Sequence, residues 1–150
     1  MNRLAHILIV EDNQDDYEAT QRSFVKNHFV NPLSWCRSGE KALQMLRGYE
    51  SDADKGPRPD LILLDLNMPG MDGRGFLKLI KADERLRSIP VIVLTTSTDA
   101  VDIQRCYHLG ASTYIQKPVS FGGLTKAVRT MADYWFGIAL LPMHRSADIR

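Results

Sequence analysis

The sequence has few of the features that stabilise a secreted protein or anchor one in a membrane. It contains only two cysteines, Cys36 and Cys106, without the spacing of a disulfide framework or a zinc site. Its longest apolar stretch, near residues 134–142, is about half of the ~20 residues that a membrane helix needs. The amino terminus has no long apolar segment typical of a signal peptide. We therefore expect a reduced, cytoplasmic protein that does not enter the membrane.

An excess of one charge is also lacking. The 19 Lys and Arg residues balance the 18 Asp and Glu residues, and the net charge is +1. The basic residues are spread along the chain, whereas a nucleic-acid-binding domain usually carries a basic stripe or patch. We therefore expect no direct nucleic-acid partner. A chain of 150 residues that is 44% hydrophobic is long enough for one domain with its own core.

Short apolar runs alternate along the chain with segments of helical periodicity. The runs, which predict buried strands, lie at residues 7–10, 61–64, 91–94 and 113–115, with a less apolar fifth candidate at 31–36. The helical segments lie at residues 14–28, 39–48, 74–82, 99–109 and 121–136. This alternation predicts an α/β fold, in which a five-stranded parallel sheet carries helices on both faces. The polar residues 51–59, which include glycine and proline, are typical of a loop.

Polar and charged side chains follow four of the predicted strands. Glu11 and Asp12 come after the first strand, Asp65 after the third, Thr95 after the fourth and Lys117 after the fifth. In an open α/β sheet the working site lies at the carboxyl ends of the strands. We therefore expect three carboxylates, a hydroxyl and an ammonium group to converge on one pocket.

This set of groups indicates phosphoryl transfer assisted by a metal ion. Clustered carboxylates repel one another and need a cation, and hard oxygen ligands in an open site suit Mg²⁺. Such an ion also neutralises charge on a phosphoryl group. Asp65 is the natural nucleophile because it lies at the centre of the cluster, and it would form an acyl phosphate. Lys117 would supply a second positive charge, and Thr95 a hydroxyl donor.

These residues resemble the motifs of the receiver domains of two-component response regulators. Glu11-Asp12 matches the acidic pair of that family, and Asp65 in Leu-Asp-Leu-Asn-Met-Pro-Gly-Met-Asp-Gly matches its phosphoacceptor loop. Thr95, Tyr114 and Lys117-Pro118 match its switch pair and its lysine, and the resemblance covers residues 5–136. It implies a (βα)5 flavodoxin-like receiver fold that takes a phosphoryl group from a sensor histidine kinase.

The resemblance also implies a role for each matching residue. Asp12 and Asp65 would bind Mg²⁺ directly, together with the backbone carbonyl of Asn67, and Glu11 would act through water or as a neighbouring ligand. Lys117 would contact the phosphoryl group, and the Lys117–Pro118 peptide would be cis, which only a bond to proline makes plausible.

Further residues are expected to switch the domain and to time its signal. Thr95 would move toward the phosphoryl group, and Tyr114 would turn inward into the space that Thr95 leaves. Asn67 and Ser97, two residues beyond Asp65 and Thr95, would tune hydrolysis of the acyl phosphate. Thr96 is bulkier than the Ala or Gly usual at its position in the family, and it could narrow access to Asp65.

Three other functions compete with this interpretation. A phosphatase or mutase of the haloacid dehalogenase type would need a second Asp two residues after Asp65, where the sequence has Asn67. A flavodoxin-like cofactor binder would need a Ser-, Thr- and Gly-rich first loop, whereas the acidic residues 11–16 would repel an anion. A receiver that acts as a phosphorylation-independent interaction module would not need the intact acidic set. We expect a protein that catalyses only its own phosphorylation and dephosphorylation.

The carboxyl-terminal segment predicts contacts beyond the domain. We assign residues 1–136 to the receiver domain and residues 137–150 to an apolar, then polar, extension, too short for an output domain, so the receiver should act on another protein. The segment carries more apolar residues than one helical face can bury, which favours a homodimer that uses the fourth and fifth helices and this extension. The expected contact residues are Tyr134, Phe136, Ile138, Leu140 and Leu141.

Three local features are similar to one subgroup of receivers. They are Val-Glu-Asp-Asn near the start, the polar insertion at residues 51–59, and an aromatic helix end followed by Leu-Leu-Pro. Small regulators that serve bacterial phytochrome-type histidine kinases share these features. The resemblance implies a light-regulated sensor kinase as the phosphodonor.

Overall fold

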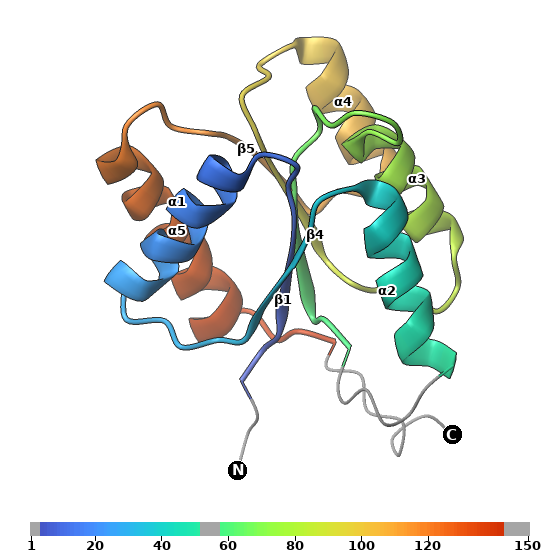
Figure 1. Cartoon of the computed structure of the whole chain (residues 1–150), viewed down its shortest axis with the longest axis horizontal. Helices are drawn as coiled ribbons and strands as arrows, with labels where there is room; N and C mark the ends of the chain where they lie inside the picture. The colour runs from blue at the N-terminus through green and yellow to red at the C-terminus, as the bar shows by residue number, and fades with distance from the viewer. Residues whose placement is uncertain (1–3, 52–57, 143–150) are drawn as a thin grey trace.

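The computed structural model in Figure 1 describes residues 4–51 and 58–142. Within these residues five strands alternate with five helices. The strands are β1 (Ile7–Val10), β2 (Leu33–Cys36), β3 (Leu61–Leu64), β4 (Val91–Thr95) and β5 (Thr113–Gln116). The helices are α1 (Gln14–Lys26), α2 (Gly39–Ser51), α3 (Gly73–Ala82), α4 (Ala100–Leu109) and α5 (Phe121–Gly137).

The strands form a single parallel sheet in the order β2-β1-β3-β4-β5. The predicted α/β class, with five parallel strands and helices on both faces, is therefore confirmed. β1 and β3 lie side by side, with Val10 opposite Leu64. Because both strands end at these residues, the polar residues that follow them emerge at the same edge of the sheet.

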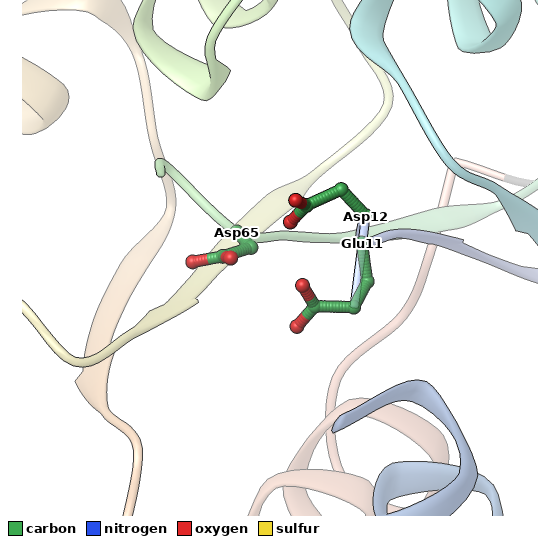
Figure 2. Close-up of side chains that lie close together, drawn as sticks. All are labelled: Glu11, Asp12 and Asp65. Atoms are coloured by element: carbon green, nitrogen blue, oxygen red, sulfur yellow. The ribbon is translucent and has the colours of Figure 1, made fainter. Parts of the chain in front are cut away.

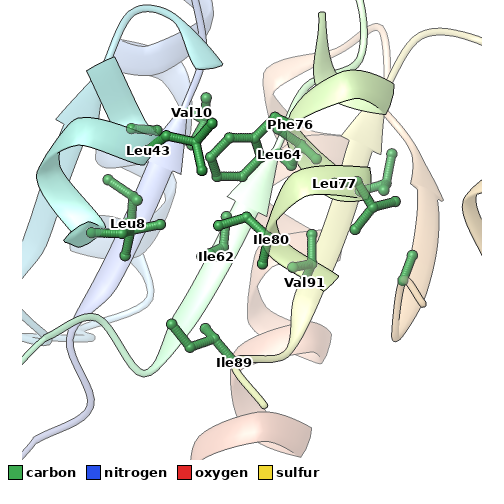
Figure 3. Packing of buried hydrophobic residues seen from close by; sticks show 14 of the residues in the cluster. Leu8, Val10, Leu43, Ile62, Leu64, Phe76, Leu77, Ile80, Ile89 and Val91 are labelled. Atoms are coloured by element: carbon green, nitrogen blue, oxygen red, sulfur yellow. The ribbon is translucent and has the colours of Figure 1, made fainter. Parts of the chain in front are cut away.

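Alternate residues along each strand face opposite layers of helices. Leu8 and Ile62 belong to a core beneath α2, α3 and α4, whereas Ile7 and Leu61 belong to a second core beneath α1 and α5. Figure 1 shows these two groups of helices on opposite sides of the sheet, and Figure 3 shows the first core, where Phe76 lies among the strand residues. This burial on both faces explains why the strands are continuous apolar runs.

Several element boundaries differ from the sequence prediction by one to three residues, and two of these differences have a clear physical cause. β2 begins at Leu33 rather than at residue 31, after Pro32, which has no N–H group for the sheet. α2 continues past Gly48 to Ser51, and the Tyr49 ring packs edge-on to His6, with 6.4 Å between centroids. Most of the predicted loop at 51–59 lies outside the described residues.

Cys36 and Cys106 are both buried, and neither forms a disulfide within the described residues. Across residues 4–51 and 58–142, no helix combines the length and the apolar character that crossing a membrane requires.

Candidate functional site

Three carboxylates meet at the carboxyl-terminal edge of the sheet. Glu11 and Asp12 follow β1 and Asp65 follows β3, and each contributes a carboxylate oxygen to a group whose members lie within 4.8 Å of one another. Figure 2 shows the side chains of Glu11 and Asp12 directed toward Asp65. Glu11 is 4% exposed and Asp65 is 9% exposed. Hard oxygen donors at this separation fit a divalent cation such as Mg²⁺ or Mn²⁺.

Lys117 supplies the positive charge beside this cluster. It follows β5, and its ammonium group forms an ion pair with Glu11 Oε1. The Nζ atom also lies 3.1 Å from Asp16 Oδ2 and 3.8 Å from Asp65 Oδ2. The predicted convergence of residues from β1, β3 and β5 is therefore present in the fold.

Burial and charge oppose each other at the Glu11–Lys117 pair. Burial, together with the charge of Asp65, raises the pKa of Glu11 to about 7, although Lys117 acts in the opposite direction. Burial alone would lower the pKa of Lys117, but the hydrogen bond to Glu11 and the surrounding carboxylates outweigh burial and raise this pKa. The site therefore holds a charged lysine and more carboxylate than this single cation neutralises.

The backbone that carries Asp65 packs tightly against the start of α3. A Cβ atom added to Gly73 would lie 2.4 Å from the Asp65 carbonyl oxygen and 2.7 Å from Leu66 Cα. The Gly73 N–H donates to the Leu66 carbonyl at 2.9 Å. Gly73 is therefore required at this position, because any side chain would displace the Asp65 backbone.

A polar network connects the end of β4 to α4. The Thr95 hydroxyl is fully buried and has no hydrogen-bond partner within the described residues. Two residues on, the Ser97 carbonyl accepts a 2.9 Å hydrogen bond from the Tyr114 hydroxyl, and the Ser97 hydroxyl donates to Asp102 Oδ2 at 3.0 Å. Tyr114, predicted as a switch residue, is half-buried and turned inward against the core.

Arg74 of α3 completes this network from the other side. Its Nε and Nη2 atoms donate to the two carboxylate oxygens of Asp102, at 2.7 and 2.6 Å. The hydrogen bonds from Arg74 and Ser97 lower the pKa of Asp102. Asp102 therefore stays charged at neutral pH and links α3, α4 and the loop after β4. This pair was not predicted from the sequence.

Other predicted site residues are exposed or contact groups outside the acidic cluster. Asn67 and Thr96 are exposed, and the Ser97 side chain contacts Asp102. The Lys117–Pro118 peptide is trans, so the expected cis bond is wrong. The trans form of an X–Pro bond is favoured by about 0.5–1 kcal/mol unless tertiary contacts override this preference. In the trans form Lys117 already reaches the carboxylates.

The residues predicted for a dimer contact fall into two groups. Phe136 and Leu141 pack against the core beneath α1 and α5, and the Phe136 ring meets the Phe29 ring edge-on, with 6.2 Å between centroids. Tyr134, Ile138 and Leu140 are 51%, 74% and 98% exposed. Residues 143–150 of the predicted extension lie outside the described residues.

Two residues at the end of β2 contact the acidic loop and were not predicted from the sequence. The Trp35 indole Nε1 donates to the Glu11 carbonyl at 2.7 Å, and Arg37 Nη2 donates to the Asp12 carbonyl at 3.1 Å. Asp16, in the first turn of α1, is a further partner of Lys117 that was not predicted. Its position four residues after Asp12 could have indicated that it lies near the acidic cluster.

Comparison with known proteins identifies the family. The response regulator receiver domain family matches residues 7–129. The chain therefore belongs to this family and is a receiver domain of two-component signalling.

Among its relatives is the probable methanogenesis regulatory protein FilR2 of Methanothrix harundinacea, which is 42% identical over 87% of this chain and 83% of its own. The response regulator Rcp1 of Synechocystis is 36% identical over 91% and 92% of the two chains.

Solved structures of similar fold include two phytochrome-linked response regulators. The phosphorylated cyanobacterial phytochrome response regulator RcpA superimposes with a TM-score of 0.85 at 37% identity, covering 93% of this chain and 99% of its own. The Mn²⁺-bound form of Rcp1 superimposes with a TM-score of 0.82 at 36% identity, covering 92% and 99%. The chain is thus similar to phytochrome response regulators, as the sequence features indicated.

Proposed function

We propose that Asp65 accepts a phosphoryl group from a sensor histidine kinase in a Mg²⁺-dependent step. The observation that carries this proposal is the group formed by the carboxylate oxygens of Glu11, Asp12 and Asp65, all within 4.8 Å of one another, beside the Lys117 ammonium. A nucleophile, a cation site and a fixed positive charge then lie together at one edge of the sheet.

The transfer exchanges one bond to phosphorus for another. A carboxylate oxygen of Asp65 bonds to phosphorus, the P–N bond of the donor phosphohistidine breaks, and the departing imidazole nitrogen takes a proton from solvent. Glu11, Asp12 and Asp65, with the backbone carbonyl of Asn67, would hold the cation, which neutralises charge on the phosphoryl oxygens when bound. Lys117 offers a second positive charge to the phosphoryl group.

The chemistry proposed is limited to the domain's own phosphorylation and dephosphorylation. A phosphatase of the aspartate-nucleophile type needs a proton donor two residues after its nucleophile, and Asn67 cannot serve as an acid or base there. Asn67, Thr96 and Ser97 are proposed to tune the lifetime of the acyl phosphate, and the exposure of Asn67 and Thr96 supports a role at the solvent side of the site.

The Thr95 hydroxyl is the proposed link between phosphorylation and the surface. An unpartnered buried hydroxyl is costly, so a phosphoryl oxygen that accepts its hydrogen bond would draw Thr95 toward Asp65. Ser97, two residues along the same loop, holds the Tyr114 hydroxyl and the Asp102 carboxylate. Movement of this loop would therefore reach α4 and the Tyr114 side chain, where another protein could detect it.

A phytochrome-type histidine kinase is the proposed phosphodonor. The support is similarity to the phytochrome response regulator RcpA along nearly the whole of both chains. FilR2, at 42% identity, is a probable methanogenesis regulatory protein rather than a phytochrome response regulator. Sequence identity alone therefore does not select the kinase. Phosphotransfer from a purified phytochrome kinase that is much faster than transfer from an unrelated histidine kinase would support the assignment, and equal rates would refute it.

A homodimer built on α4, α5 and the residues that follow α5 is also proposed. Tyr134, Ile138 and Leu140 are exposed. Tyr134 also lines a groove of about 630 Å³, together with Ile115 of β5 and Ala127 of α5. Light scattering should give a dimer mass that Leu140→Asp together with Ile138→Asp converts to monomer. A monomer of the unsubstituted protein at high concentration, phosphorylated or not, would refute this arrangement.

Intact-mass measurement tests the phosphorylation itself. Incubation with a small phosphodonor and Mg²⁺ should add one phosphoryl group to the unsubstituted protein and none to Asp65→Asn. Removal of the metal with EDTA should abolish the addition. A phosphoryl group that still appears on Asp65→Asn would remove the assignment of Asp65.

A further inference from the structure

The end of β2 holds the loop that carries Glu11 and Asp12. This loop is short, because β1 ends at Val10 and α1 begins at Gln14. The Glu11 N–H donates to the Cys36 carbonyl at 3.0 Å, which extends the β1–β2 pairing one residue beyond β1. The residues on either side of Cys36 bind the next two carbonyl groups of the loop. The Trp35 side chain donates to the Glu11 carbonyl, and the Arg37 side chain donates to the Asp12 carbonyl.

The indole donor is itself held in place by its neighbours. The Tyr17 ring lies parallel to the Trp35 ring, with 4.1 Å between centroids and an angle of 3°. The Arg37 guanidinium lies over the Trp35 ring, 5.1 Å from its centroid. A ring that contacts an aromatic face and a cation has little freedom to turn, so the Nε1–H bond stays directed at the Glu11 carbonyl.

Three carboxylates this close together repel one another. Without further contacts, this repulsion would rotate the backbone of the loop between β1 and α1 and turn Glu11 and Asp12 away from Asp65. Val10 is held by the sheet, and Asn13 caps α1 by accepting from the Asp16 N–H at 2.9 Å. With both ends fixed, the orientations of the Glu11 and Asp12 peptide groups decide whether the two carboxylates face Asp65. The hydrogen bonds from Trp35 and Arg37 fix these orientations.

We propose that Trp35 and Arg37 are positioning residues for the divalent-cation site, holding Glu11 and Asp12 turned toward Asp65 before the cation binds. This inference rests on the proposed function, because it concerns the same cation site. It adds that the affinity of the site depends on an edge strand whose residues do not touch the cation. Groups that orient metal ligands commonly change metal affinity by 10- to 100-fold when removed. A hydrogen bond to a ligand's backbone acts less directly, so we expect a change of about 3- to 10-fold.

Trp35→Phe is the sharpest variant because it removes the N–H donor without changing charge. Replacing Arg37 would also remove a positive charge that repels a cation, and the two effects would oppose each other. Trp135→Phe makes the same chemical change in α5 and serves as the matched control. Mn²⁺ affinity, measured from the electron paramagnetic resonance signal of free Mn²⁺, should be about 3- to 10-fold weaker for Trp35→Phe and unchanged for Trp135→Phe.

A shape-matched analogue separates the hydrogen bond from packing. In the Trp135→Phe protein, Trp35 is replaced by 3-benzothienylalanine, which has sulfur in place of the N–H group and keeps the stacking on Tyr17. This protein should lose Mn²⁺ affinity to the same extent as Trp35→Phe, and it keeps the test valid if the phenylalanine variant does not fold. Unchanged affinity in either folded variant would overturn the inference. If the unsubstituted protein itself does not bind Mn²⁺, the cation step of the proposed function fails instead.

Discussion

Replacing Asp12 with asparagine should stabilise the metal-free protein and weaken its response to Mg²⁺. The reason is the repulsion among carboxylates whose oxygens lie within 4.8 Å of one another. Coulomb's law with an effective dielectric constant of about 20 gives about 3.5 kcal/mol for two unit charges at this distance. Lys117 and solvent around the half-buried Asp12 offset much of this repulsion. We therefore expect the free energy of unfolding of Asp12→Asn to rise by about 1–2 kcal/mol.

Adding Mg²⁺ should reverse the order of stability of the unsubstituted protein and Asp12→Asn. In EDTA at pH 8, above the Glu11 pKa of about 7, the melting temperature of Asp12→Asn should be about 3–6 °C higher than that of the unsubstituted protein. The unsubstituted protein should gain about 2.7 kcal/mol at a Mg²⁺ concentration 100-fold above the dissociation constant. Asp12→Asn, which lacks one of the carboxylate ligands, should gain much less. Scanning calorimetry with and without Mg²⁺ measures both effects.

Asp15→Asn is the matched control for this experiment. Asp15 is exposed in the first turn of α1, outside the cluster, where a carboxylate interacts favourably with the helix amino terminus. Its replacement should destabilise the protein slightly and leave the response to Mg²⁺ intact. The reasoning would be refuted if Asp12→Asn were less stable than the unsubstituted protein in EDTA, or if it kept the full stabilisation by Mg²⁺.

Two further predictions concern the network beside the site. A double-mutant cycle with Asp102→Asn and Arg74→Met should give a coupling energy of about 1 kcal/mol in urea unfolding at pH 7, because the pair is only partly buried. Since pairing lowers the pKa of Asp102, this coupling should be lost as the pH falls through that lowered pKa; a coupling that does not weaken on acidification would contradict the assignment. Thr95→Val should raise the free energy of unfolding by about 1 kcal/mol, because it removes a buried hydroxyl without a partner among the described residues. It should also abolish any change in hydrogen exchange at the Tyr114 backbone amide on phosphorylation. A destabilised variant would contradict the stability prediction, and a variant that still shows the exchange change would refute the switching role of the hydroxyl.

The sequence predicted the sheet well because burial on both faces leaves a simple pattern. β1 and β3 are uninterrupted apolar runs, β4 is apolar up to its last residue, and runs this short are typical of buried strands. The end of α2 was less predictable. Gly48 resembles a helix terminus, but a glycine inside a helix costs only about 1 kcal/mol, and the contact between Tyr49 and His6 lies on the far side of that glycine.

The acidic cluster was predictable because parallel strands bring their carboxyl ends to one edge. The residues that hold the cluster in place were not. Trp35 contacts Glu11 across 24 positions of sequence, and Arg74 contacts Asp102 across 28. Both contacts join a side chain of one element to a neighbouring element, and they depend on rotamers that no periodic pattern specifies. The expected cis bond at Pro118 failed for a similar reason, since the isomer depends on local packing.

Only two positions along the loop after β4 separate the proposed phosphorylation site from the side chains that lead to the surface. Thr95 is the last residue of β4, whereas Ser97 binds both the Tyr114 hydroxyl and Asp102. Tyr114 is held at its other end as well, because its backbone N–H donates to the hydroxyl of Tyr107 at 3.0 Å. Tyr107 is 48% exposed on α4. A displacement of Thr95 that shifts Ser97 must therefore alter contacts of Tyr114 and Asp102, and through them the exposed face formed by α4 and β5.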